Sequence, residues 1–152
     1  MQSKQGYLIT STLLLFGILM VAVKKWRKPL DGKITSKFGY RIHPITKAST
    51  FHNGIDITAP IGTKIYAPYT GFIQTIITNS AGGLQMKVKH SNGFITGYAH
   101  LSDVVFPIGT KVRKGQIIAY SGNTGKVTGP HLHFTLTDPT GTKVDPEKFI
   151  FS

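Results

Sequence analysis

Residues 85–99 read QMKVKHSNGFITGYA, two runs of strand-forming residues on either side of Asn92-Gly93. An Asn-Gly pair between two such runs is a strong signal for a two-residue turn, because both residues tolerate the positive φ angles that the turn requires. The stretch therefore predicts two antiparallel strands joined by a tight turn. It also indicates that the residues around it belong to an all-β fold.

The chain after Pro29 continues in the same way, with short runs of β-branched and aromatic residues separated by Gly, Pro, Asn and Asp. Further runs of this kind are 64–67, 71–77 and 116–120. No window there keeps a 3.6-residue apolar period long enough for a substantial helix. Residues 29–152 are therefore predicted to form one all-β domain, an antiparallel sheet of barrel-like shape, in which the similar segments 61–65 and 108–112 make equivalent turns into strands.

Residues 7–23, YLITSTLLLFGILMVAV, carry no charge and precede the basic run Lys24-Lys25-Trp26-Arg27-Lys28. This length is close to the lower limit of roughly 17–25 residues for a helix that spans a bilayer, and basic residues beside a Trp are typical of the membrane interface. A removable signal peptide is the alternative, but the small-x-small cleavage site that it needs is poorly matched. Residues 1–28 are therefore predicted to be an N-terminal transmembrane anchor with a basic flank.

The chain has a net charge of +12 and no cysteine. The lack of cysteine excludes disulfides, thiolate metal sites, a cysteine nucleophile and a lipoprotein-type anchor. The positive charge attracts anions such as anionic lipid and cell-wall polymers, although a merely soluble basic surface explains it equally well. There is no basic helix and no nucleic-acid-binding motif, so we expect no nucleic-acid partner, and nothing in the sequence points to an oligomeric state.

Several histidines and one aspartate lie in short segments that have the residue types of a metal site. The segments are 51–57, 97–101 and 129–134. Residues two apart on a strand project from the same face, so His131 and His133 share one face while their apolar neighbours enter the core. His52 and Asp56 share a face in the same way if their segment is extended, which Asn-Gly and the β-branched residues after it favour over a helix.

Zinc binds imidazole nitrogen and carboxylate oxygen, and a catalytic site uses three protein ligands and leaves the fourth position to water. His52, Asp56 and one histidine of the His131/His133 pair would make such a set. The remaining histidines could take a proton from the water and donate to the oxyanion that develops during amide hydrolysis. Glu147 is the only glutamate and stands far from any histidine pair, which excludes a helical H-E-x-x-H enzyme.

Five segments together resemble the lysostaphin/LytM-type zinc endopeptidases, in that family's order and over about residues 32–149. They are FGYRIHP (38–44), HNGID (52–56), YAHL (98–101), GNTG (122–125) and GPHLHF (129–134). The resemblance implies an antiparallel β-sheet fold with one zinc ion held by His52, Asp56 and His133. It implies catalytic roles for His100 and His131, and substrates that are peptide bonds of bacterial peptidoglycan, in cross-bridges or between stem peptides.

Arg41, His43 and Tyr98 are candidate substrate contacts. The resemblance places the loop that carries His43 beside the substrate groove, although a plain loop residue is equally expected there. The Arg41 guanidinium could bind a stem-peptide carboxylate or form a surface ion pair. Tyr98 lies two residues before His100 and on a regular strand would share its face, so that it could donate to substrate or simply pack as an aromatic. His90, beside the hairpin turn, is expected to be solvent-exposed.

The sequence thus predicts a membrane-anchored zinc endopeptidase that hydrolyses peptidoglycan, with the catalytic domain outside the cytoplasm in a cell envelope or a phage virion membrane. The positive-inside rule alone would leave the domain in the cytoplasm, because the heavier basic cluster follows the predicted span. One alternative is a catalytically inactive wall-binding or regulatory module of the same fold. Another is a biotinyl- or lipoyl-type carrier, suggested by the V-x-K-G turn at 112–115, but a carrier has no use for the histidine and aspartate pattern.

Overall fold

The computed structural model describes residues 26–42 and 47–151. Within these ranges it contains twelve β-strands and one short helix, which confirms the predicted all-β class. The elements are β1 (Ile34–Ser36), β2 (Gly39–Ile42), β3 (Ser49–His52), β4 (Ile55–Thr58), β5 (Lys64–Tyr66), β6 (Gly71–Asn79), β7 (Gly83–His90), β8 (Ile95–Val104), β9 (Lys111–Val112), β10 (Ile117–Ser121), β11 (His131–Thr137), β12 (Lys143–Val144) and α1 (Glu147–Ile150).

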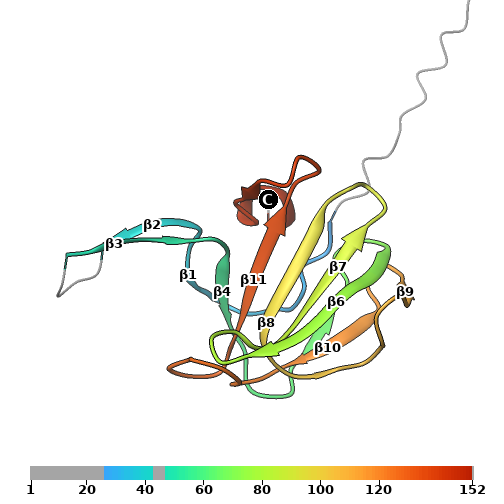
Figure 1. Cartoon of the computed structure of the whole chain (residues 1–152), viewed down its shortest axis with the longest axis horizontal. Helices are drawn as coiled ribbons and strands as arrows, with labels where there is room; N and C mark the ends of the chain where they lie inside the picture. The colour runs from blue at the N-terminus through green and yellow to red at the C-terminus, as the bar shows by residue number, and fades with distance from the viewer. Residues whose placement is uncertain (1–25, 43–46, 152) are drawn as a thin grey trace, which may run out of the picture.

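Ten of these strands form one antiparallel sheet built on the order β1-β4-β11-β8-β7-β6-β9. Strand β10 pairs with both β5 and β8, and β12 pairs with β11. Figure 1 shows the long strands β6, β7, β8 and β11 side by side, with the two-stranded ribbon β2–β3 projecting away from them. Because β4, β11 and β8 are neighbours, the segments that carry the candidate site residues meet on adjacent strands.

Strands β7 and β8 form the expected hairpin, but its loop is one residue longer than predicted. His90 N donates to Phe94 O at 2.8 Å and Gly93 N donates to His90 O at 3.0 Å, which leaves three residues in the loop. Gly93 has a φ of 87°, whereas Asn92 does not adopt the positive φ that a two-residue turn requires of it. The position of the turn predicted from Asn92-Gly93 is therefore confirmed, whereas the predicted two-residue length is wrong.

Alternation along β11 separates the core from the open face of the sheet. Leu132 and Phe134 are fully buried, whereas His131 and His133 are half-buried on the opposite face. The predicted division of this strand is confirmed, and it aims both histidines away from the hydrophobic core.

The similar segments 61–65 and 108–112 form the same kind of turn into a strand. In each, the threonine N–H donates to the carbonyl of the proline three residues before it, at 3.2 Å and 3.3 Å, and the glycine has a φ of 83° or 88°. They lead into β5 and β9, which both belong to the large sheet, so the predicted equivalence is confirmed.

His90 is buried, contrary to the expectation that it would be exposed beside the turn. Only 3% of its surface is accessible, and its Nε2 lies 2.8 Å from Thr96 Oγ1. Trp26 packs edge-on against the imidazole with 5.4 Å between ring centroids, and it also contacts Tyr69 and Phe94. The expectation was wrong because residues from before the first strand cover this end of the hairpin.

The start of the described chain belongs to the folded domain. Arg27 N donates to Pro68 O at 3.0 Å, and the Arg27 guanidinium lies 3.9 Å from the centre of the Tyr66 ring. The boundary between residues 28 and 29 stays a prediction, but these contacts show that Trp26 and Arg27 pack on the folded domain. The predicted span at residues 7–23 lies outside the described residues, and in the described part no helix is both long and apolar enough to cross a bilayer.

Burial lowers the pKa of His90 from 6.5 to about 4, so the folded state favours the neutral ring. The resulting stability is complete above pH 6.5 and falls as the pH drops toward 4. At and below pH 4 the loss should reach roughly 3 kcal/mol in the free energy of unfolding. We expect His90→Gln, which can keep a hydrogen bond to Thr96 but cannot titrate, to flatten this dependence in urea denaturation. If the free energy of unfolding of the variant still falls with pH as in the wild-type protein, another group is responsible for the dependence.

Candidate active site

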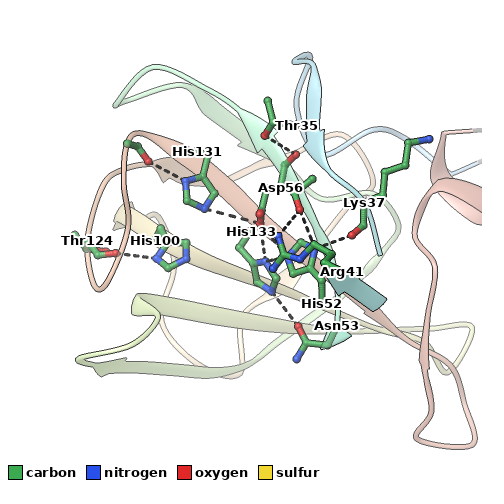
Figure 2. A network of polar contacts seen from close by, with 12 residues as sticks. Thr35, Lys37, Arg41, His52, Asn53, Asp56, His100, Thr124, His131 and His133 are labelled. Atoms are coloured by element: carbon green, nitrogen blue, oxygen red, sulfur yellow. Dashed lines mark hydrogen bonds and ion pairs between the residues drawn. The ribbon is translucent and has the colours of Figure 1, made fainter. Parts of the chain in front are cut away.

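Three of the expected ligand side chains converge where β3, β4 and β11 meet. His52 ends β3, and Asp56 in β4 lies directly opposite His133 in β11. Asp56 Oδ1 is 2.8 Å from His133 Nδ1 and 3.2 Å from His52 Nε2, and the two imidazole nitrogens are 3.1 Å apart. Figure 2 shows the three side chains directed toward one another, and their ligating atoms all lie within 4.8 Å of each other.

The outer nitrogens of the two imidazoles face oxygen atoms that can only accept a hydrogen bond. His52 Nδ1 lies 2.8 Å from Lys37 O, and His133 Nε2 lies 3.1 Å from Asn53 Oδ1. Each outer nitrogen therefore donates its N–H, which in the neutral ring leaves a lone pair on His52 Nε2 and on His133 Nδ1. Two lone pairs and one carboxylate oxygen thus face a common point.

This donor set fits a zinc-type cation. Ligand atoms about 2.0–2.1 Å from a tetrahedral ion would lie about 3.3 Å from one another. The separations of 2.8–3.2 Å among the three ligating atoms are close to that value. Two imidazole nitrogens and one carboxylate oxygen leave a fourth position open, and they provide too few oxygen ligands for a calcium cage.

The charge state of Asp56 suits such a site. Burial alone would raise the pKa of this carboxyl, but the adjacent His133 and His52 imidazoles, when they carry a proton on the nitrogen that faces Asp56, hold it well below its usual range. Asp56 therefore stays ionised at neutral pH and provides one of the negative charges that a divalent cation requires.

The two expected catalytic histidines lie together beside the candidate ligands. His100 Nδ1 donates to Thr124 O and His131 Nδ1 donates to Gly129 O, each at 2.8 Å. Their rings are 4.8 Å apart between centroids, and His131 Nε2 lies 3.9 Å from Asp56 Oδ1, outside the group of three ligating atoms. Burial lowers the pKa of His100, so its ring is neutral at pH 7 and its Nε2 is available as an acceptor.

His100 reaches this position through a β-bulge. On β7, Leu84 and Met86 are two residues apart, but their partners on β8, Leu101 and Tyr98, are three apart. The extra residue falls at His100, which has a φ of 62° in the left-handed region. Side chains on either side of the bulge therefore no longer alternate as in a regular strand.

The bulge overturns the expectation that Tyr98 shares a face with His100. Tyr98 is 1% exposed, packs against Phe134, and has its hydroxyl 2.8 Å from Thr96 Oγ1. Burial raises the pKa of Tyr98 above its ordinary value. Tyr98 is a core residue, and its side chain does not reach the open face where a substrate would lie.

Arg41 lines the same hollow as the candidate metal and catalytic residues. Its guanidinium donates to Ser36 Oγ at 2.5 Å, and Ser36 Oγ lies 3.4 Å from His52 Nδ1. This location keeps Arg41 as a candidate substrate contact. His43 lies outside the described residues, so its expected role stays a prediction.

Sequence reasoning missed the site contributions of Asn53 and Gly54. Asn53 accepts from His133, and a Cβ atom at Gly54 would lie 2.4 Å from Phe134 O and 3.1 Å from His133 Cε1. A side chain at Gly54 would therefore push β4 away from β11. Both residues stand in the HNGID segment beside His52, and this position next to a candidate ligand is the signal that could have identified them.

The left-handed backbone of His100 gives a testable stability difference. A non-glycine residue in this region carries a strain of roughly 1–2 kcal/mol that glycine avoids. We expect His100→Gly to be about 1 kcal/mol more stable to urea than His100→Ala. At Thr75, which has no positive φ, the order should be reversed, with the glycine variant less stable than the alanine variant. If His100→Gly is less stable to urea than His100→Ala, the backbone at residue 100 is not strained.

The chain matches the family described as "Peptidase family M23" over residues 50–146. It is 43% identical over 113 residues to the peptidoglycan DD-endopeptidase ShyA of Vibrio cholerae. The match covers 72% of this chain and 26% of that protein, so the chain spans about a quarter of the length of this relative.

Two solved structures support the same assignment. A zinc-containing peptidase from Vibrio cholerae superposes with a TM-score of 0.75 at 34% identity, over 80% of this chain and 39% of that one. The catalytic domain of lysostaphin from Staphylococcus simulans gives a TM-score of 0.69 at 31% identity, over 80% of this chain and 93% of that domain. The resemblance to the lysostaphin/LytM-type enzymes is confirmed. The family match spans more than half of the chain and includes all the candidate metal and catalytic residues, and the chain therefore belongs to peptidase family M23.

Proposed function

We propose that this protein is a zinc-dependent endopeptidase that hydrolyses peptide cross-links of bacterial peptidoglycan. The observation that carries the proposal is the convergence of His52 Nε2, Asp56 Oδ1 and His133 Nδ1 next to two further histidines. A catalytically inactive module of the same fold would have no need of this complete set. The relatives support peptidoglycan as the substrate class, because ShyA is a peptidoglycan DD-endopeptidase and lysostaphin is an antimicrobial peptidase.

In this proposal, His52, Asp56 and His133 hold the metal. A zinc ion there would polarise the carbonyl of the peptide bond and make a water molecule more acidic. The zinc-containing peptidase of Vibrio cholerae supports zinc as the metal. The Nε2 atoms of His100 and His131 then serve as the proton carriers, because the Nδ1 atom of each ring already donates to a backbone carbonyl.

The two proton carriers have different surroundings and are proposed to have different tasks. His131 Nε2 lies 3.9 Å from Asp56 Oδ1, next to the candidate metal ligands, and once it carries a proton it is proposed to donate to a developing oxyanion. His100 is kept neutral by burial, which suits it to accept the proton of the attacking water. Arg41 at the rim of the hollow is proposed to contact a substrate carboxylate.

We further propose that residues 7–23 anchor the protein in a membrane with the peptidase domain outside the cytoplasm. The length and apolar character of the segment support a span, and a peptidoglycan substrate requires the domain on that side. The basic residues that follow the segment would favour the opposite orientation, so protease accessibility in spheroplasts is the decisive measurement.

Alanine variants separate metal ligands from proton carriers. We expect His52→Ala and His133→Ala to lose both zinc and hydrolysis of cross-linked muropeptides. His100→Ala and His131→Ala should keep about one zinc per chain and lose turnover by roughly 10²–10⁴-fold. Elemental analysis beside a turnover assay measures both quantities on the same samples.

His90→Gln is the control for these variants, because this histidine is buried away from the site and should keep both zinc and activity. Loss of zinc in His131→Ala with retention in His133→Ala would reverse the two roles. A wild-type protein without metal, matched by an unaffected His52→Ala variant, would overturn the site altogether.

Fractionation tests the anchor. We expect the full chain in the membrane fraction and a chain that lacks residues 1–25 in the soluble fraction, still active. A chain that lacks residues 1–28 also loses the contacts of Trp26 and Arg27, and should be less stable by roughly 1–3 kcal/mol. A mature N-terminus near Lys24 would identify a cleaved signal peptide instead.

A further inference from the structure

Two lysines border a gap on the same open face of the sheet that carries the candidate active site. Lys87 on β7, Gly97 on β8 and Thr135 on β11 are successive cross-strand partners. Lys143 on β12, the strand next to β11, places its Nζ 3.2 Å from Thr135 Oγ1. Lys87 and Lys143 therefore approach the position of Gly97 from opposite sides.

The gap exists because Gly97 has no side chain. A Cβ atom there would lie 2.5 Å from Thr135 Oγ1 and 4.0 Å from Lys87 Cγ. With neighbouring strands about 4.8 Å apart, the backbones of Lys87 and Thr135 are separated by roughly 10 Å. That width admits one extended peptide over the glycine, between the side chains of the flanking strands.

The hollow over Gly97 runs into the candidate active site. Its lining includes Lys87 and Lys143 at one end and His133 at the other. Gln85 and His133 also line the neighbouring hollow that contains His100. A peptide bound at the candidate metal ligands can thus extend along the sheet to the two lysines.

The charges of the two lysines are not balanced within the described chain. In residues 26–42 and 47–151 neither lysine forms an ion pair with a carboxylate, and Thr135 between them is neutral. Burial lowers the pKa of Lys143, and the charge of Lys87 lowers it further. Two like charges without an intervening acid favour the binding of an anion.

We propose that Lys87 and Lys143 form a subsite for a free carboxylate of the peptide substrate, an inference that rests on the peptidase function proposed above. Lys87 lies two residues beyond Gln85 on β7, and Thr135 lies two residues beyond His133 on β11. The two lysines are therefore about 7 Å farther along the sheet than the candidate metal ligand His133. An extended peptide covers that distance in about two residues. The subsite therefore selects peptides with a carboxylate about two residues from the bond that is cut, and discriminates against amidated ones.

The test compares two forms of one ligand, a cross-linked muropeptide dimer with free carboxylates and the same dimer after carbodiimide amidation. Calorimetry on His131→Ala, which should cleave the dimer roughly 10²–10⁴-fold more slowly than the wild-type protein, gives both dissociation constants. We expect the free dimer to bind roughly tenfold more tightly than the amidated one, as for a charge-assisted contact. Adding Lys87→Met or Lys143→Met should abolish this preference by weakening only the free dimer.

Lys111→Met is the matched control, since it removes the same charge from an exposed position on β9 and should leave the preference intact. Equal affinity for both dimers, or an equal loss with Lys111→Met, would overturn the subsite. Cleavage of the free dimer by the wild-type protein is measured separately. No cleavage, with the lysine-dependent preference preserved, would refute the peptidase function and still support the subsite.

Discussion

The site depends on the pairing register of β4 and β11, which places Asp56 directly opposite His133. A slip of one residue would turn His133 into the core and Leu132 onto the open face, because side chains alternate along a strand. Burial of Leu132 and Phe134 fixes the register from the core side, and the missing side chain at Gly54 allows the close approach of the strands. The hydrophobic core on one face of β11 thus positions the candidate metal ligands on the other face.

Hydrogen bonds around the site histidines fix the orientation and the tautomer of each imidazole ring. His52, His100 and His131 each donate from Nδ1 to a backbone carbonyl, whereas His133 donates from Nε2 to the side chain of Asn53. In each ring the other nitrogen is left as an acceptor. His133 therefore presents Nδ1 to the ligand cluster and His52 presents Nε2, a difference set entirely by where the fixed oxygen acceptors lie.

Local sequence patterns predicted the features that depend on alternation and turn chemistry. The hairpin around Asn92-Gly93, the all-β class and the division of β11 into core and open face all follow from residues close together in the chain. Features that depend on tertiary packing could not be read in this way. Burial of His90 requires Trp26 from the start of the described chain, and the placement of His100 on the face opposite to Tyr98 requires a bulge that the residue types at 98–101 do not predict. The carbonyl partners of the histidines are equally invisible in sequence, because every residue carries a carbonyl.

The short segment 97–100 shows how one strand serves both the groove and its chemistry. Gly97 and Ala99 face the open side opposite Thr135 and His133, and their small size makes β8 the floor of the groove between β7 and β11. Tyr98 between them packs into the core against Phe134 and so anchors β8 to the hydrophobic core. If the alternation continued, His100 would point into the core, since Ala99 faces outward; the bulge instead turns His100 onto the open face next to His131. Because the same bulge returns Leu101 to the core, a strained backbone at one residue supplies a catalytic candidate while the hydrophobic packing on both sides of it is preserved.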